Sequence, residues 1–214
     1  MARARQPRRA RRSRRTRAAT AFTSALTATL TAALLSLTSA VIAPSAHADE
    51  IPANGNFTFT TGPGILPAWD SAGVSLVGVS PGSVITNTLT NTARVILPVI
   101  SKSGTANATA GGFRFVNTES GESFRCSVPV VDTRARVIDC VLPSGYNSAV
   151  FEISAIDERT KVNTAVTKTT IFQGMELRII NREMANRLND ELDTSVFSAS
   201  VVLGSGSLIV SRAR

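Results

Sequence analysis

The sequence predicts an all-β fold, an antiparallel sandwich or a partly closed barrel with one short C-terminal helix. Residues 49–214 are rich in Val, Ile, Thr, Phe and Ser, residue types that favour strands. Short runs of these residues are separated by Gly, Pro, Asn and Asp at intervals of roughly 8–12 residues, which is typical of all-β domains. One segment, at about 181–192, departs from this pattern.

The predicted strands follow one another through the whole of residues 57–211. They are Phe57–Thr60, Val74–Val79, Val84–Leu89, Arg94–Ser101, Gly112–Asn117, Ser123–Val131, Arg136–Leu142, Ala149–Ile156, Val162–Phe172, Glu176–Ile180, Val196–Leu203 and Ser207–Ser211. A short helix between the first two strands is doubtful, because Pro63, Gly64 and Pro67 interrupt the segment.

The segment at about 181–192 is predicted to be helical. Asn181 is a suitable N-cap, and Met184, Ala185, Leu188 and Leu192 then recur with the period of an α-helix. Charged residues occupy the other sides. We expect the apolar stripe to pack on the sheet.

The two cysteines are predicted to form a disulfide within a hairpin. A three-residue turn at 132–134 would place Cys126 directly opposite Cys140, at a separation compatible with a disulfide. The alternative of a redox-active pair lacks the C-x-x-C spacing. Pro129 would face outward and mark an edge strand.

The first 48 residues have the three parts of a secretory signal peptide. Nine Arg lie within residues 3–17, residues 18–43 carry no charge, and Ala46-His47-Ala48 matches the A-x-A cleavage pattern. Cleavage is therefore expected between Ala48 and Asp49. We expect a secreted or envelope-associated protein, with one β-rich domain at 49–214.

A basic head followed by an uncharged run is also compatible with two other functions. The uncharged run is long enough to be a retained membrane anchor, but its Thr content and its cleavage motif favour removal. An Arg-rich nucleic-acid arm would not continue into an apolar run with a cleavage site. The export route stays open between general secretion and twin-arginine export. The pair Arg14-Arg15 fits a twin-arginine signal, but Arg17 stands where such signals prefer an apolar residue.

Charge and composition exclude several functions for the mature chain. The formal net charge of +8 comes from the head, because residues from Asp49 onward have 14 Lys or Arg and 15 Asp or Glu, about −1. Nucleic acid is therefore not the expected partner, and the membrane is expected to contact only the uncleaved head. The single His, His47, lies in the head. His-based catalysis and His-ligated metal or haem are thus excluded after cleavage.

One motif and four acids are the catalytic candidates of the sequence. Residues 78–82 match G-x-S-x-G, but a strand-like run follows and no His does, so we interpret them as a turn between strands. Asp157, Glu158, Asp190 and Glu191 would serve a carboxylate-based hydrolase only if two of them shared a concave pocket. Solvated surface charge is the simpler interpretation, and no catalytic residue and no metal ligand is expected.

Small motifs across 57–210 carry a family resemblance. They are Phe57-Thr58-Phe59-Thr60, Ala72-Gly73-Val74, Ser80-Pro81-Gly82, Gly111-Gly112-Phe113-Arg114-Phe115, Leu177 to Ile180, Leu188-Asn189, Phe197, and Gly204 to Val210. With these motifs the mature chain resembles the secreted HtaA-type domains of actinobacteria, which are β-rich modules of surface haem-acquisition proteins. The resemblance implies a β fold outside the cell.

The haem ligands of that family are not matched here. The family uses a Tyr ligand supported by His, whereas the mature chain has no His and only Tyr146, within a predicted turn. A Tyr can ligate haem iron alone. Three functions therefore stay open: a non-enzymatic domain with a binding or structural role, which needs no cofactor; a haem-binding module with Tyr146 as ligand; and a carboxylate-based hydrolase.

Overall fold

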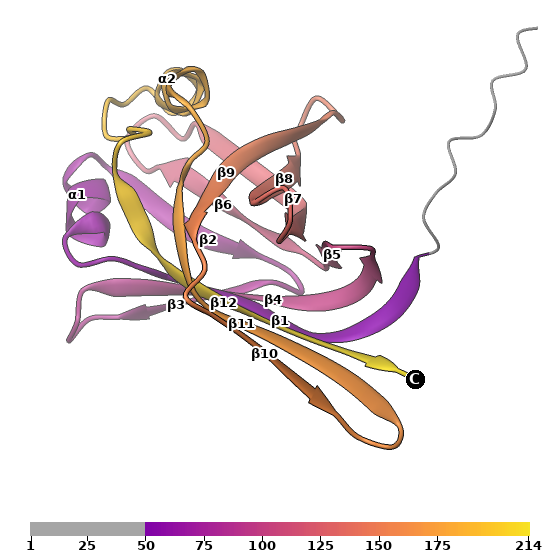
Figure 1. Cartoon of the computed structure of the whole chain (residues 1–214). Helices are drawn as coiled ribbons and strands as arrows, with labels where there is room; N and C mark the ends of the chain where they lie inside the picture. The colour runs from indigo at the N-terminus through magenta and orange to yellow at the C-terminus, as the bar shows by residue number, and fades with distance from the viewer. Residues whose placement is uncertain (1–49) are drawn as a thin grey trace, which may run out of the picture. The chain divides into compact units, whose positions relative to one another are not determined.

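The computed structural model describes residues 50–214 and shows an antiparallel β-barrel with additional strands and two short helices (Figure 1). The predicted signal peptide, 1–48, and its cleavage site at Ala46, Ala48 and Asp49 lie outside the described residues. No helix within 50–214 is long and apolar enough to cross a membrane.

The chain forms twelve strands and two helices over this range. They are β1 (Ile51–Thr61), α1 (Ile65–Ser71), β2 (Val74–Val79), β3 (Ser83–Asn87), β4 (Thr92–Ser103), β5 (Ala106–Thr109), β6 (Gly112–Asn117), β7 (Ser123–Asp132), β8 (Val137–Val141), β9 (Asn147–Ala155), β10 (Glu158–Asn163), β11 (Thr167–Ile179), α2 (Arg182–Glu191) and β12 (Val202–Ala213).

Eight of the strands form a closed ring. Their order is β7-β5-β4-β1-β12-β11-β9-β8, and β8 pairs back with β7, all antiparallel. The predicted all-β class is confirmed, and the barrel closes completely rather than partly. The eight strands of the ring and the buried core described here belong to residues 51–213.

The other four strands extend the sheet away from this ring. The strand β6 pairs with β7, and β2 pairs in turn with β6. The strand β3 pairs with β4, and β10 pairs with β11. As Figure 1 shows, the β10–β11 hairpin projects from the barrel at the lower right.

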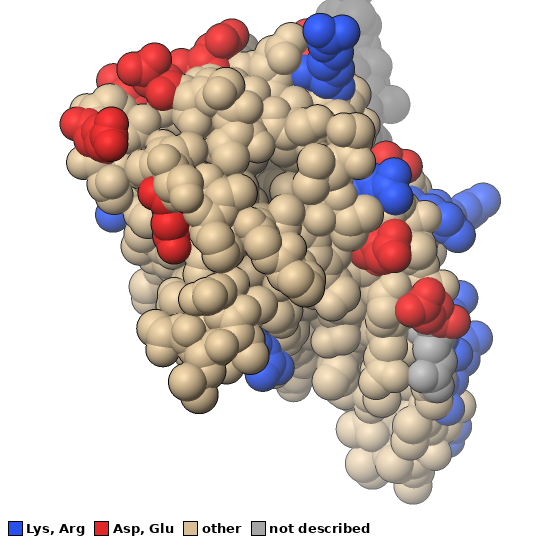
Figure 2. Space-filling model, turned by 90° about the vertical axis from the view of Figure 1, so that its left-hand side faces the viewer, with Lys and Arg blue, Asp and Glu red and all other residues tan. Residues whose placement is uncertain are grey.

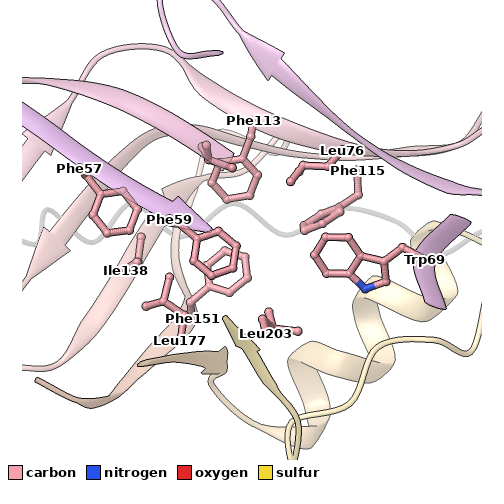
Figure 3. Close-up of a pocket in the computed structure, with 11 residues that line it drawn as sticks. Phe57, Phe59, Trp69, Leu76, Phe113, Phe115, Ile138, Phe151, Leu177 and Leu203 are labelled. Atoms are coloured by element: carbon pink, nitrogen blue, oxygen red, sulfur yellow. The ribbon is translucent and has the colours of Figure 1, made fainter. Parts of the chain in front are cut away.

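Aromatic and aliphatic side chains fill the barrel interior. In β1, Phe57 and Phe59 are buried while Thr58 between them is partly exposed, as the two-residue period of a strand requires. The remaining cavity is only about 20 Å³, which holds about one water molecule. Its lining, drawn in Figure 3, is Phe57, Phe59, Trp69, Leu76, Val95, Phe113, Phe115, Ile138, Phe151, Leu177 and Leu203.

Both helices pack at one end of the barrel. The predicted helix is confirmed as α2, where the side chain of Asn181 accepts a hydrogen bond of 2.8 Å from the N–H of Met184. The doubtful helix also forms, as the seven-residue α1. Pro67 is tolerated in its first turn, where no intrahelical donor is required, and Leu66 and Trp69 are buried beneath it.

Three strand predictions need correction. The run 162–172 is not one strand, because a turn at 164–166 separates β10 from β11; the Thr164 hydroxyl accepts from the N–H of Thr167 at 3.0 Å there. The run 196–203 is mostly a loop, held by two hydrogen bonds of 2.9 Å between the Asn189 side-chain amide and the Phe197 backbone. The strand β5 was not predicted, because Ala-Asn-Ala-Thr has little β propensity.

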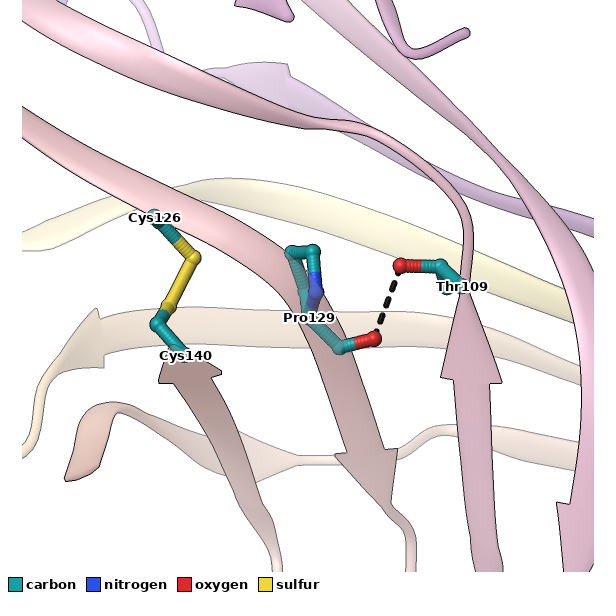
Figure 4. Close-up of a disulfide and its surroundings, with 4 residues drawn as sticks. All are labelled: Thr109, Cys126, Pro129 and Cys140. Carbon is teal, nitrogen blue, oxygen red and sulfur yellow. Dashed lines mark hydrogen bonds between the residues drawn. A yellow bond between two sulfur atoms is a disulfide. The ribbon is translucent and has the colours of Figure 1, made fainter. Parts of the chain in front are cut away.

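The cysteine hairpin has a different register from the predicted one. The structure joins Cys126 and Cys140 by a disulfide with a Cα–Cα distance of 4.9 Å (Figure 4). However, the turn spans four residues, 133–136, since Asp132 pairs with Val137. A bulge between Ser127 and Val130 then shifts the pairing, so the two cysteines are not direct partners in the ladder.

The same bulge overturns the prediction for Pro129. It is buried rather than outward-facing, and β7 is not an edge strand, since it pairs with β5, β6 and β8. Val128, at φ +43°, is the residue turned outward. The bulge removes the need for an N–H at Pro129, and its carbonyl accepts a hydrogen bond of 2.7 Å from the Thr109 hydroxyl.

Candidate functional site

Cationic side chains gather in a hollow at one end of the barrel, on the inner face of the projecting sheet. The hollow has a volume of about 340 Å³ and is built from β4, β10, β11 and β12. Its lining residues are Lys102, Arg159, Lys161, Asn163, Lys168, Thr169, Thr170, Val210 and Arg212. We call this hollow the basic groove. Figure 2 shows a group of Lys and Arg side chains along the lower right-hand edge of the molecule.

The strand geometry explains why these cations share one face. Arg159 and Lys161 are two residues apart on β10, so both side chains point to the same side. The register partner of Arg159 is the buried Phe172, which identifies that side as the inner one. The Arg159 guanidinium carbon lies 5.2 Å from the centroid of the Phe172 ring, a cation–π contact.

Two further cations meet across neighbouring strands. Lys168 on β11 is the register partner of Arg212 on β12, and on its other side it pairs with Asn163. Direct cross-strand neighbours have closely spaced Cβ atoms, and like charges there are unfavourable. Val210, which is buried, forms the apolar part of the lining. The arrangement thus holds like charges together at a cost in stability.

No carboxylate neutralises the basic groove among the side chains that the structure describes. The lining contains no Asp or Glu, and the two ion pairs found within 50–214, Arg178–Glu176 and Arg187–Glu191, lie elsewhere. Burial, and then the charges of Arg212 and Arg159, lower the pKa of Lys102 from its usual value. An anion in the groove would relieve this repulsion.

These residues are suited to phosphate or carboxylate groups. Arg159 and Arg212 present planar forks that can bind two anionic oxygens at once, and the three lysines supply point charges. Thr170, in register with Lys161, adds a hydroxyl donor to the same hollow, whereas the Thr169 hydroxyl is hydrogen-bonded to that of Ser211 at 2.8 Å. A ligand with several anionic groups would contact cations from four strands together.

Tyr146 lies outside the basic groove. It occupies the turn between β8 and β9, with 76% of its surface exposed, and its carbonyl accepts a hydrogen bond of 3.0 Å from the N–H of Leu142. The surroundings of an exposed turn offer no apolar walls for a porphyrin. The residues around Tyr146 therefore do not fit haem.

The four acids considered for hydrolysis are divided between separate places. Asp190 and Glu191 line an open hollow of about 660 Å³ with Glu122 and Asp193, near the C-terminal end of α2. Asp157 lies just before β10, with its carboxylate against Gly174, and the side chain of Glu158 is not described. Two of the four thus share a hollow, but Glu191 is engaged by Arg187 at 2.6 Å. Within 50–214 no group of acidic, His or Cys side chains is arranged to hold a metal.

The G-x-S-x-G motif forms the turn between β2 and β3, as predicted. Ser80 is exposed, its peptide bond to Pro81 is cis, and a strand begins at Ser83. A Cβ on Gly82 would lie 2.6 Å from the carbonyl oxygen of Gly112, so the turn packs tightly on the start of β6. The glycines serve this close approach and do not form a nucleophile elbow.

The basic groove was not predicted from the sequence. A net charge of about −1 averages over residues 49–214 and hides a local excess, and the five cations come from positions 102 to 212. The one local signal was the alternation of Arg159 and Lys161 within the run 158–163.

Comparison with known proteins shows a likeness of fold to a solved structure. No family model and no curated protein matches this chain. Among solved structures, the fold is similar to that of the haem-binding protein HtaB from Corynebacterium glutamicum, at a TM-score of 0.49 and 8% sequence identity. The alignment covers 78% of this chain and 96% of that one.

Proposed function

We propose that residues 49–214 form an exported, non-enzymatic binding domain that takes an anionic ligand in the basic groove. The observation that carries this proposal is the group of five cations, from four strands, that line one hollow with no acidic neighbour among the described side chains. Such an arrangement costs stability, which a bound anion would restore. Export is supported by the signal-like head and by the cysteine pair.

The ligand that best suits this groove carries at least two anionic groups. Arg159 and Lys161 are spaced by two residues along a strand, about 7 Å, and Lys168 and Arg212 face each other across strands. A single small anion would contact only one of these pairs. A phosphate chain or a polycarboxylate could contact both.

Calorimetric titration of the 49–214 protein with tripolyphosphate tests this proposal. We expect saturable binding that weakens as salt is raised. The triple variant Lys161→Gln, Lys168→Gln, Arg212→Gln should bind about 100-fold more weakly, on the order of 1 kcal/mol for each charge.

A matched triple variant controls for net charge. Arg94→Gln, Arg114→Gln, Arg182→Gln removes the same number of exposed cations from outside the basic groove. It should bind tripolyphosphate as the unmodified protein does. Equal weakening by both triple variants would show that only net charge matters and would refute a groove-specific site.

The haem-binding alternative is tested by titrating haemin into the same protein. Because Tyr146 is exposed in a turn without apolar walls, we expect no Soret band that depends on it. The spectra of the unmodified protein and of Tyr146→Phe should coincide. A saturable band that disappears in Tyr146→Phe would restore the haem-binding function and displace the one proposed here.

A further inference from the structure

We infer that the β10–β11 hairpin docks this domain on a membrane surface that contains anionic lipids, with the basic groove holding lipid headgroups. This inference rests on the proposed anion-binding function and names the source of the anion. It departs from the expectation that only the uncleaved head contacts a membrane. Its basis is the combination of an exposed apolar hairpin tip with the groove cations on the same ribbon.

The hairpin extends beyond the barrel wall. One edge of β11 changes its partner along the strand. Near the barrel, Glu176 to Ile179 pair with β9, whereas Lys168 to Gln173 pair with β10. Figure 1 shows that this part of the ribbon leads away from the barrel, to a turn at its far end. The turn thus lies at the outer end of the ribbon, beside Arg214, whose N–H donates a hydrogen bond of 3.1 Å to the carbonyl of Val166.

Exposed apolar side chains lie in this turn and just before it. Val166 is 71% exposed and Ala165 is also exposed within the turn. Val162, 48% exposed, lies near the end of β10 on the face opposite Lys161. Single exposed apolar residues are ordinary on protein surfaces. Here they stand beside a concentration of positive charge, and amphipathic elements that bind anionic membranes combine these two features.

The cations lie within reach of headgroups when the tip enters the interface. Lys168 is two residues beyond Val166, about 7 Å along the strand, and Arg212 is its cross-strand partner. Lys161 pairs with Thr170, two residues farther from the tip. A shallow insertion of Val166 would thus bring these three cations toward the phosphate layer, where each raises the binding constant about five-fold.

Sedimentation with extruded vesicles tests this inference on the 49–214 protein. We expect binding to vesicles of phosphatidylcholine with 30 mol% phosphatidylglycerol, and little binding to phosphatidylcholine alone. The double variant Val162→Ser, Val166→Ser should lower the partition coefficient about 10-fold, through loss of apolar insertion, and should leave tripolyphosphate affinity unchanged. The triple variant of the groove should lower both.

Leu89→Ser is the control for the hairpin tip. Leu89 is 94% exposed between β3 and β4, so this change removes an apolar side chain from a different hairpin. It should leave vesicle binding unchanged; an effect as large as that of the double variant would overturn the inference. Tripolyphosphate binding without vesicle binding would refute docking and leave the anion site standing. If the unmodified protein binds neither tripolyphosphate nor the vesicles, the proposed function itself is refuted.

Discussion

Trp69→Ala should lower the free energy of unfolding by about 4 kcal/mol, the largest effect that we expect from one substitution. Trp69 is only 2% exposed. Its ring contacts Phe115 edge-on at a centroid distance of 5.1 Å (Figure 3). It also contacts the ring of Phe197, at a centroid distance of 5.8 Å. It also anchors the short helix α1 to the barrel. Truncation would leave a large void in an interior that is otherwise filled.

Urea denaturation followed by circular dichroism measures this loss, since the variant has no tryptophan to report by fluorescence. Trp69→Phe should cost clearly less, because it keeps an aromatic ring against Phe115. Leu89→Ala, at an exposed site, should stay within about 0.5 kcal/mol of the unmodified protein. A loss below about 1 kcal/mol for Trp69→Ala would contradict the packing described here.

Removing the disulfide should cost about 3 kcal/mol. Cys126 and Cys140 are 0% and 1% exposed, and their bond links β7 to β8 across the bulge, where the ladder is interrupted. These two strands are neighbours in the closed ring. The bond therefore constrains the barrel at a point where few backbone hydrogen bonds hold it.

The double variant Cys126→Ala, Cys140→Ala and the unmodified protein should be compared by urea denaturation. Intact mass should show the 49–214 protein, made under oxidising conditions, about two hydrogens lighter before reduction than after it under denaturing conditions. Two free thiols in that protein would argue against the bond. An unchanged free energy of unfolding would show that the pairing of β7 with β8 is sufficient without it.

Local patterns predicted most strands and the helix, because alternation and helical period act over a few residues. Val74–Val79 and Gly112–Asn117 agree with the structure at both ends. The strand β5 could not be predicted in this way. Its Ala-Asn-Ala-Thr segment is held by its neighbours, for example through the Asn107 side chain, which donates to the carbonyl of Val131 at 3.1 Å.

Features that depend on distant residues were beyond sequence reasoning. The bulge at 128–129 reverses which side chains face inward, so an uninterrupted alternation assigned Pro129 to the wrong face. The basic groove requires Lys102, Lys168 and Arg212 to meet across strands that are far apart in sequence. Only the register of the closed sheet brings them together.

The pairing of β1 with β12 has a consequence for how the domain folds. Asn54 and Ser211, which are direct partners in the sheet, are 157 positions apart in the chain. Such long-range contacts give a high contact order, and folding on the order of milliseconds to seconds is typical of it. The ring cannot close before its last strand is present, since Leu208 and Val210 complete the core. The domain must therefore reach its native state as a whole chain, after β12 has been synthesised.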